Sequence, residues 1–236
     1  DRMKTAVYFL LLFAALALVF FPTFFNPPHV DYWEAFFTFH QVRADPDLGP
    51  WPYVVNHDPW RHGTFRPLSY TLLYLEHLLF GSRFIFNHLL NFAVYCLVLV
   101  LLFRLGLRLG ARRYETAVFL AVFAFLYSHC DILSLTFHIF ILAGLAGFIA
   151  AFLCYLRFLA GGDRRLLAAA GILIIFSMLA YEAFALWPLS LLILMAVRPP
   201  PRSFRKRLCP TIITLAAVYC LYFGVFYLTR HASHLS

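Results

Sequence analysis

Residues 84–103 read FIFNHLLNFAVYCLVLVLLF, and this stretch decides the fold of the chain. It holds 20 residues without one Asp, Glu, Lys or Arg. An α-helix needs about 20 mostly apolar residues to cross the hydrocarbon core of a bilayer. Two further uncharged runs, residues 5–25 and 132–156, are at least as long. We therefore predict an all-α polytopic membrane protein.

The composition agrees with this fold class and excludes others. Hydrophobic residues make up 63% of the chain and charged residues 13%, whereas a soluble domain has about half and about a quarter. The formal net charge is +8, but the basic residues cluster in short links between apolar runs, which is typical of membrane topology signals. We expect no nucleic-acid partner. The five cysteines lack any CxxC or Cys/His ligand spacing, so neither a disulfide framework nor a zinc site is indicated.

The apolar runs predict about seven transmembrane helices, with bounds 5–25, 84–103, 114–128, 132–156, 166–180, 183–197 and 209–229. The region 166–197 holds 32 residues, and one helix of that length would measure about 48 Å, against a hydrocarbon core of about 30 Å. We therefore expect a hairpin that turns at Tyr181 and Glu182, and one long tilted helix is the alternative. Gly144 and Gly147, in the fourth segment, are small enough to let membrane helices pack closely.

The charges of the links predict the orientation of the chain. With the N-terminus in the cytoplasm, the inner links hold 14 of the 19 lysines and arginines, as the positive-inside rule requires. The outer side then holds eight of the 11 acids and all ten histidines. We expect an integral protein of a bacterial inner membrane or an equivalent membrane, with a cytoplasmic N-terminus and an extracytoplasmic active face.

Residues 26–83 form one long polar stretch between the first two expected spans. A loop of this length is uncommon without a function or structure of its own. We expect it to carry two interfacial helices, Val30–Val42 and Leu68–Phe80, each too short to span. Pro67 suits the first position of the second helix, and Gly81 suits its C-terminal stop.

Polar side chains gather in this loop and at the outer helix ends. Asp31 and Glu34 share one face of the first interfacial helix. Between the two helices the chain has Trp51, Asn56, His57, Asp58, Trp60, Arg61, His62 and Arg66. At or near outer helix ends lie Asp131, His138 and Glu182, which are expected to line the same pocket. Ionisable groups in membrane segments are costly and suggest function; the alternative for each is a charge that reaches water at a helix end.

The order of several short motifs resembles that of a known superfamily. The motifs are Asp58-Pro59-Trp60, Phe65-Arg66-Pro67-Leu68-Ser69-Tyr70, Leu79-Phe80-Gly81 and Phe86-Asn87-His88-Leu89-Leu90-Asn91. Together they resemble the first outer loop and second helix of superfamily C (GT-C) glycosyltransferases. The nearest branch is that of the tetratricopeptide-bearing O-mannosyltransferases, followed by the protein O-mannosyltransferases and the lipid A aminoarabinose transferase. The resemblance extends roughly over residues 5–197 and includes the links around Asp131 and Glu182.

This resemblance implies a single transmembrane domain over residues 1–236 and a specific chemistry. Members of the superfamily transfer a sugar from a polyprenyl-phosphate carrier to a protein, lipid or glycan acceptor at the outer membrane face. Asp31 then corresponds to the catalytic base of an inverting transfer, with Glu34 beside it. The donor phosphate is expected to bind Arg66, helped by His57, Arg61 and His62. Glu34 and Asp58 are candidates for holding a divalent cation, Mg²⁺ or Mn²⁺.

Two other function classes stay open from the sequence. The chain could be a catalytically silent GT-C-like subunit of a larger membrane complex, with membrane lipids and other subunits as its partners. It could also be a transporter, although transporters usually place polar residues near the bilayer midplane. Relatives carry further C-terminal helices or a soluble domain, so a fragment of a longer protein is a further alternative.

Overall fold

The computed structural model describes residues 2–25, 37, 39–40, 66–126, 138–186, 188–197 and 204–232. All regular secondary structure in these ranges is helical. The elements that matter most for the membrane are α1 (Arg2–Phe20) with the 3-10 turn η1 (Phe21–Phe25), α6 (Phe84–Leu109), α9 (Ile139–Gly161) and α12 (Phe204–Ala232). The all-α prediction is therefore confirmed for the described part of the chain.

Four helices of the described residues are long and apolar enough to cross a membrane: Met3–Phe25, Phe84–Leu109, Ile139–Gly161 and Arg207–Leu228. Their outer surfaces are rich in large apolar side chains; Leu18, for example, is 78% exposed and Leu228 is 69% exposed. An apolar surface of this extent is unfavourable in water and suits contact with lipid acyl chains. The chain is an integral membrane protein.

The remaining helices are shorter, and they are α5 (Pro67–Phe80), α7 (Arg113–Ala124), α10 (Arg164–Ala180), η3 (Glu182–Leu186) and α11 (Leu189–Val197). The 12 residues of α7 rise only about 18 Å, and the 17 residues of α10 only about 26 Å, which is less than the thickness of a hydrocarbon core. The expected seven helical segments are thus present, but only four qualify as spans, and seven spans stay a prediction.

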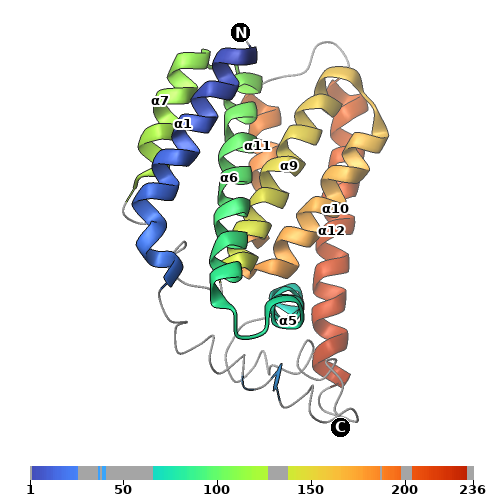
Figure 1. Cartoon of the computed structure of the whole chain (residues 1–236). Coiled ribbons are helices and arrows are strands. Elements are labelled where there is room, and N and C mark those ends of the chain that lie inside the picture. Colours follow the sequence, from blue (N-terminus) through green and yellow to red (C-terminus); the bar gives the residue numbers. More distant parts are fainter. Residues whose placement is uncertain are drawn as a thin grey trace.

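The chain path alternates in direction through the bundle (Figure 1). Helices α1, α6, α7, α9, α10, α11 and α12 follow a common axis, and α5 lies across the end of the bundle opposite the N-terminus. The turn expected at Tyr181 and Glu182 is present, because α10 ends at Ala180, Tyr181 is extended (φ −156°, ψ 120°) and η3 begins at Glu182. The alternative of one long tilted helix is therefore wrong.

Two helices extend past their expected C-terminal bounds. The sequence prediction ended the second span at residue 103, before Arg104, and the fourth at residue 156, before Arg157. The helices instead continue to Leu109 and Gly161. Long arginine side chains can lie along an apolar helix while their charged heads reach the membrane surface, so an arginine need not end a span.

Helix α9 is at the centre of the bundle. Of its most apolar window 56% is buried inside the structure, compared with 22% for the first span. One core cluster joins α9 to α10 and α12 through buried residues such as Tyr155, Ile174 and Val218. A second cluster joins α1, α6 and α7 and also includes Leu142 of α9.

Two glycines allow α9 and α10 to approach closely. A Cβ atom at Gly144 would lie 2.5 Å from Cε2 of Phe184, and one at Gly147 would lie 2.8 Å from Oγ of Ser177. Both distances are shorter than any real Cβ contact, so a side chain at either position would displace its neighbour. The glycines therefore serve packing, as small residues do in membrane helices.

We predict that Gly144→Val destabilises the protein, because the added side chain must push Phe184 of η3 away from α9. Overpacking of this kind costs about 1–3 kcal/mol. A lower Tm in detergent, measured by the rate at which the half-buried Cys96 and Cys154 react with a thiol reagent on heating, would report the loss. Gly161→Val is the matched control, since Gly161 lies on the same helix with nothing within 4 Å of its added Cβ. Equal Tm values for the two variants would contradict the packing role.

Candidate functional site

Helix α5 closes the bundle end that is opposite the N-terminus. Pro67 is at its first position, and Gly81 ends it with a positive φ of 55°, where its N–H donates to the His77 carbonyl at 2.9 Å. One side of α5 is buried against the bundle through Ser69, Leu73 and Glu76. A helix is thus present where the sequence predicted one. That it lies in the membrane surface stays a prediction.

A serine and an arginine connect α5 to the end of α10. The Ser69 hydroxyl donates to the carbonyl of Ala180, the last residue of α10. The guanidinium carbon of Arg66 lies 4.4 Å from the ring centroid of Tyr181 and 5.8 Å from that of Phe140. Cations are attracted to ring faces at such distances, and also to the C-terminal ends of helices.

The Arg66 and His138 side chains, both predicted site residues, lie next to this aromatic pair, and the backbone of a third, Glu182, follows it. The ring centroids of Phe140 and Tyr181 are 6.1 Å apart, and the His138 ring lies edge-on to Phe140 at 6.4 Å. Glu182 follows Tyr181 directly as the first residue of η3. Residues that are 72 and 44 positions apart in the sequence, Arg66, His138 and Glu182, therefore belong to one small region of the bundle end.

The other predicted site residues fall outside the described residues: Asp31, Glu34, His57, Asp58, Arg61, His62 and Asp131. Most of the expected helix Val30–Val42 also lies outside them, with residues 37, 39 and 40 in helical conformation. The described residues contain no group of three His, Cys, Asp or Glu side chains that could hold a metal ion. Glu34 and Asp58, where the sequence predicted a divalent cation, lie outside the described residues.

A buried polar cluster lies between α5 and α6, and sequence reasoning did not propose it. Glu76, His77, Asn87, His88 and Asn91 form this cluster, and each is at most 3% exposed. Phe39 covers part of it, with its ring centroid 5.9 Å from that of His77. Three polar residues in the first two turns of an otherwise apolar span were the signal that could have found it, because such groups are costly in membrane helices.

Glu76 is the titratable centre of this cluster. Burial raises the pKa of its carboxyl from 4.5 to about 8, and the nearby Asn87 side chain opposes this by a smaller amount. Neither carboxylate oxygen has a hydrogen bond of ordinary geometry to the described residues. A carboxyl with a pKa near neutrality can accept or release a proton under physiological conditions.

Arg66 and Glu76 mark the two ends of α5. Ten residues separate them, which corresponds to about 15 Å along a helix. The guanidinium group supplies a fork of donors suited to a phosphate, and the carboxyl supplies a proton carrier. The bundle end therefore combines a guanidinium group near α10 with a buried acid near α6.

Comparison with known proteins adds no relative. No family model, no curated protein and no solved structure matches the chain.

We predict that Glu76 makes the stability of the protein depend on pH. Its folded pKa lies above its unfolded value, so its stabilising effect is complete below pH 4.5 and is lost as the pH rises to about 8. Glu76→Gln should remove this slope, and its Tm should approach or exceed that of the parent at pH 8. A change of about 1 kcal/mol shifts Tm by about 2–4 °C in a chain of this size.

Thermal unfolding in detergent at several pH values measures the slope. Glu115→Gln is the matched control, because Glu115 is an exposed acid at the other end of the bundle that bonds the Arg112 backbone N–H. If Glu76→Gln and the parent lose stability in parallel between pH 5 and 8, the Glu76 carboxyl is not held protonated in the folded state over this pH range.

Proposed function

We propose that the chain is a polyprenyl-phosphate-sugar-dependent glycosyltransferase that acts at the extracytoplasmic membrane face with inversion at the sugar carbon. The observation that carries the proposal is the meeting of Arg66, His138 and the Glu182 turn at one bundle end. Residues 26–65 begin after Phe25 and end before Arg66 at this same end, and they carry Asp31 and most of the other polar candidates.

The layout suits a donor with a charged head and an apolar tail. Arg66 would bind the phosphate of the carrier at the membrane surface. Toward its C-terminal end, α5 exposes an apolar surface formed by Leu75, Leu78 and Leu79, of which Leu79 is 72% exposed. An isoprenoid chain has the chemistry to lie along such a surface.

The proposed reaction has four balanced changes. Asp31 takes the proton of the acceptor hydroxyl, the acceptor oxygen bonds to the sugar carbon, the bond from that carbon to the phosphate oxygen breaks, and polyprenyl phosphate leaves. General base catalysis of this kind contributes about 10²–10⁴-fold to rate. Arg66 would stabilise the negative charge that grows on the leaving phosphate. In this proposal, Glu34 and Asp58 would hold a divalent cation.

A second candidate is a silent subunit with the same scaffold. It is favoured by the packing role of the α5 residues, since Ser69 bonds α10 and Arg66 lies on Tyr181. Contacts of this kind would hold the bundle end together even without any substrate. The two candidates differ in whether a polyprenyl phosphate binds near Arg66.

We predict that Asp31→Asn reduces sugar transfer by about a hundredfold or more, because it removes the base. The measurement is transfer from polyprenyl-phosphate-mannose in vesicles that contain the full chain. Arg66→Ala should raise the KM for the donor more than the KM for the acceptor, and Arg66→Lys should lose less. Tyr181→Phe is the control, since it keeps the ring beneath Arg66 and removes only the hydroxyl.

Three results would contradict the proposal. Full activity of Asp31→Asn would exclude Asp31 as the base. An unchanged donor KM in Arg66→Ala would exclude Arg66 from the phosphate site. An inactive parent chain that binds no polyprenyl phosphate and copurifies at fixed stoichiometry with other subunits would favour the silent subunit.

A further inference from the structure

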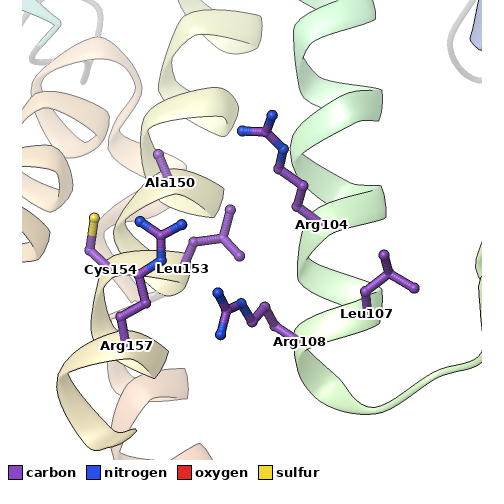
Figure 2. A pocket seen from close by; sticks show the side chains of 7 residues that line it. All are labelled: Arg104, Leu107, Arg108, Ala150, Leu153, Cys154 and Arg157. Atoms are coloured by element: carbon purple, nitrogen blue, oxygen red, sulfur yellow. The ribbon is translucent and has the colours of Figure 1, made fainter. Parts of the chain in front are cut away.

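A second region of interest lies at the opposite end of the bundle, where the N-terminus is found (Figures 1 and 2). An open cavity of about 650 Å³ lies there between the C-terminal parts of α6 and α9. It is lined by Arg104, Leu107, Arg108, Ala150, Leu153, Cys154 and Arg157. The proposed transferase site is at the other end, so the cavity has no part in it.

Three arginines give this cavity its charge. Arg104 and Arg108 are one turn apart on α6, and Arg157 comes from α9. Figure 2 shows the guanidinium groups of Arg104 and Arg108 extending from α6 toward α9, and the Arg157 side chain running along α9. No acidic residue is among the described residues that line the cavity.

The described acids at this bundle end are engaged elsewhere. Glu115 accepts the Arg112 backbone N–H at 2.9 Å at the start of α7. Asp163 accepts the Arg165 backbone N–H at 2.9 Å at the start of α10. Both carboxylates therefore serve as N-terminal helix caps, and neither of them lines the cavity.

The helix ends beside the cavity offset only part of its charge. Helices α6 and α9 both end here, and each C-terminus supplies about half a negative elementary charge. Three guanidinium groups carry three positive charges, against about one negative elementary charge from the two helix C-termini together. Like charges held this close repel one another, and an anion with more than one negative charge would relieve the repulsion.

The walls of the cavity are apolar toward the middle of the membrane. Leu153 and Ala150 lie one and two turns before Arg157 on the same side of α9. Further inward, Val98 of α6 packs against Ala146 and Ile149 of α9. The cavity is thus charged near the bundle end and apolar nearer the middle of the bundle. A lipid, with a charged headgroup and apolar chains, has the same distribution of polarity, whereas a soluble ion does not.

We propose that this cavity binds the phosphate headgroup of an anionic lipid from the leaflet on the N-terminal side of the membrane. Basic pockets between transmembrane helices bind cardiolipin and phosphoinositide headgroups in this way. Arg104 and Arg157 hold the headgroup phosphates from two sides, and the acyl chains lie along Ala150 and Leu153. A headgroup with two phosphates can present one phosphate to each of these two arginines.

The test is a lipid titration of the full chain in nonionic detergent, read by native mass spectrometry. The probes are tetraoleoyl cardiolipin, which has two phosphates, dioleoyl phosphatidylcholine, which has no net charge, and inorganic phosphate. We expect cardiolipin to bind and phosphatidylcholine to bind at least about tenfold more weakly, since each arginine near an anionic headgroup contributes about a fivefold preference. The double variant Arg104→Gln, Arg157→Gln should lose that preference.

The matched control is the double variant Arg113→Gln, Arg165→Gln, which removes two charges from the same bundle end without touching the cavity. Arg104→Lys, Arg157→Lys keeps the charge and reports any folding defect. A cardiolipin preference that survives in the Gln double variant, or that falls equally in the control, would overturn the proposal. Displacement of cardiolipin by millimolar inorganic phosphate would assign the cavity to a soluble anion instead.

A second measurement needs no substitution. Cys154 lines the cavity, while Cys209 lies at the same bundle end outside it. We expect maleimide labelling of Cys154, relative to Cys209, to slow severalfold when the chain moves from phosphatidylcholine vesicles to vesicles that also contain cardiolipin. An unchanged ratio of the two labelling rates would overturn the proposal.

Discussion

The close approach of α9 to α10 is the contact on which the rest of the structure depends. Gly144 lets Phe184 of η3 sit directly against α9, and the Phe184 ring then lies 5.9 Å from that of Tyr181. Tyr181 in turn lies beneath the Arg66 guanidinium at the start of α5. The position of α5 across the bundle end therefore follows, through two aromatic rings, from the absence of a single Cβ atom.

The two ends of the bundle differ in whether their ionisable side chains are buried or exposed. At the α5 end, Glu76 and its polar neighbours are buried, and a raised pKa keeps a proton on the carboxyl near neutral pH. At the other end, Arg104, Arg108 and Arg157 are exposed around an open cavity. A carboxyl can lose its charge on burial at moderate cost, whereas a guanidinium stays charged at every accessible pH. The acid can therefore enter the packed bundle, whereas the three arginines stay at its exposed surface.

Tyrosine hydroxyls show how the short helices are held within this frame. The Tyr95 hydroxyl donates to the carbonyl of Ala124 at 3.1 Å, where α7 ends after only 12 residues. The Tyr219 hydroxyl of α12 donates to the Ala185 carbonyl of η3 at 2.6 Å. Each bond satisfies a carbonyl that a longer helix would have paired internally. Short helices of this kind are tolerated inside a membrane protein because neighbouring spans supply the missing partners.

Hydrophobic runs and link charges were enough to predict a polytopic helical membrane protein, the turn after Ala180 and the helix that begins at Pro67. These features are local, since run length, proline position and a charged interruption act on neighbouring residues alone. Three-dimensional packing decided the rest: which helices end early, that Arg66 lies on Tyr181, that Glu76 is buried against α6, and that Arg104 and Arg157 face one cavity. Each of these depends on residues far apart in the sequence, and only the packing of α9 with its neighbours brings them within reach of one another.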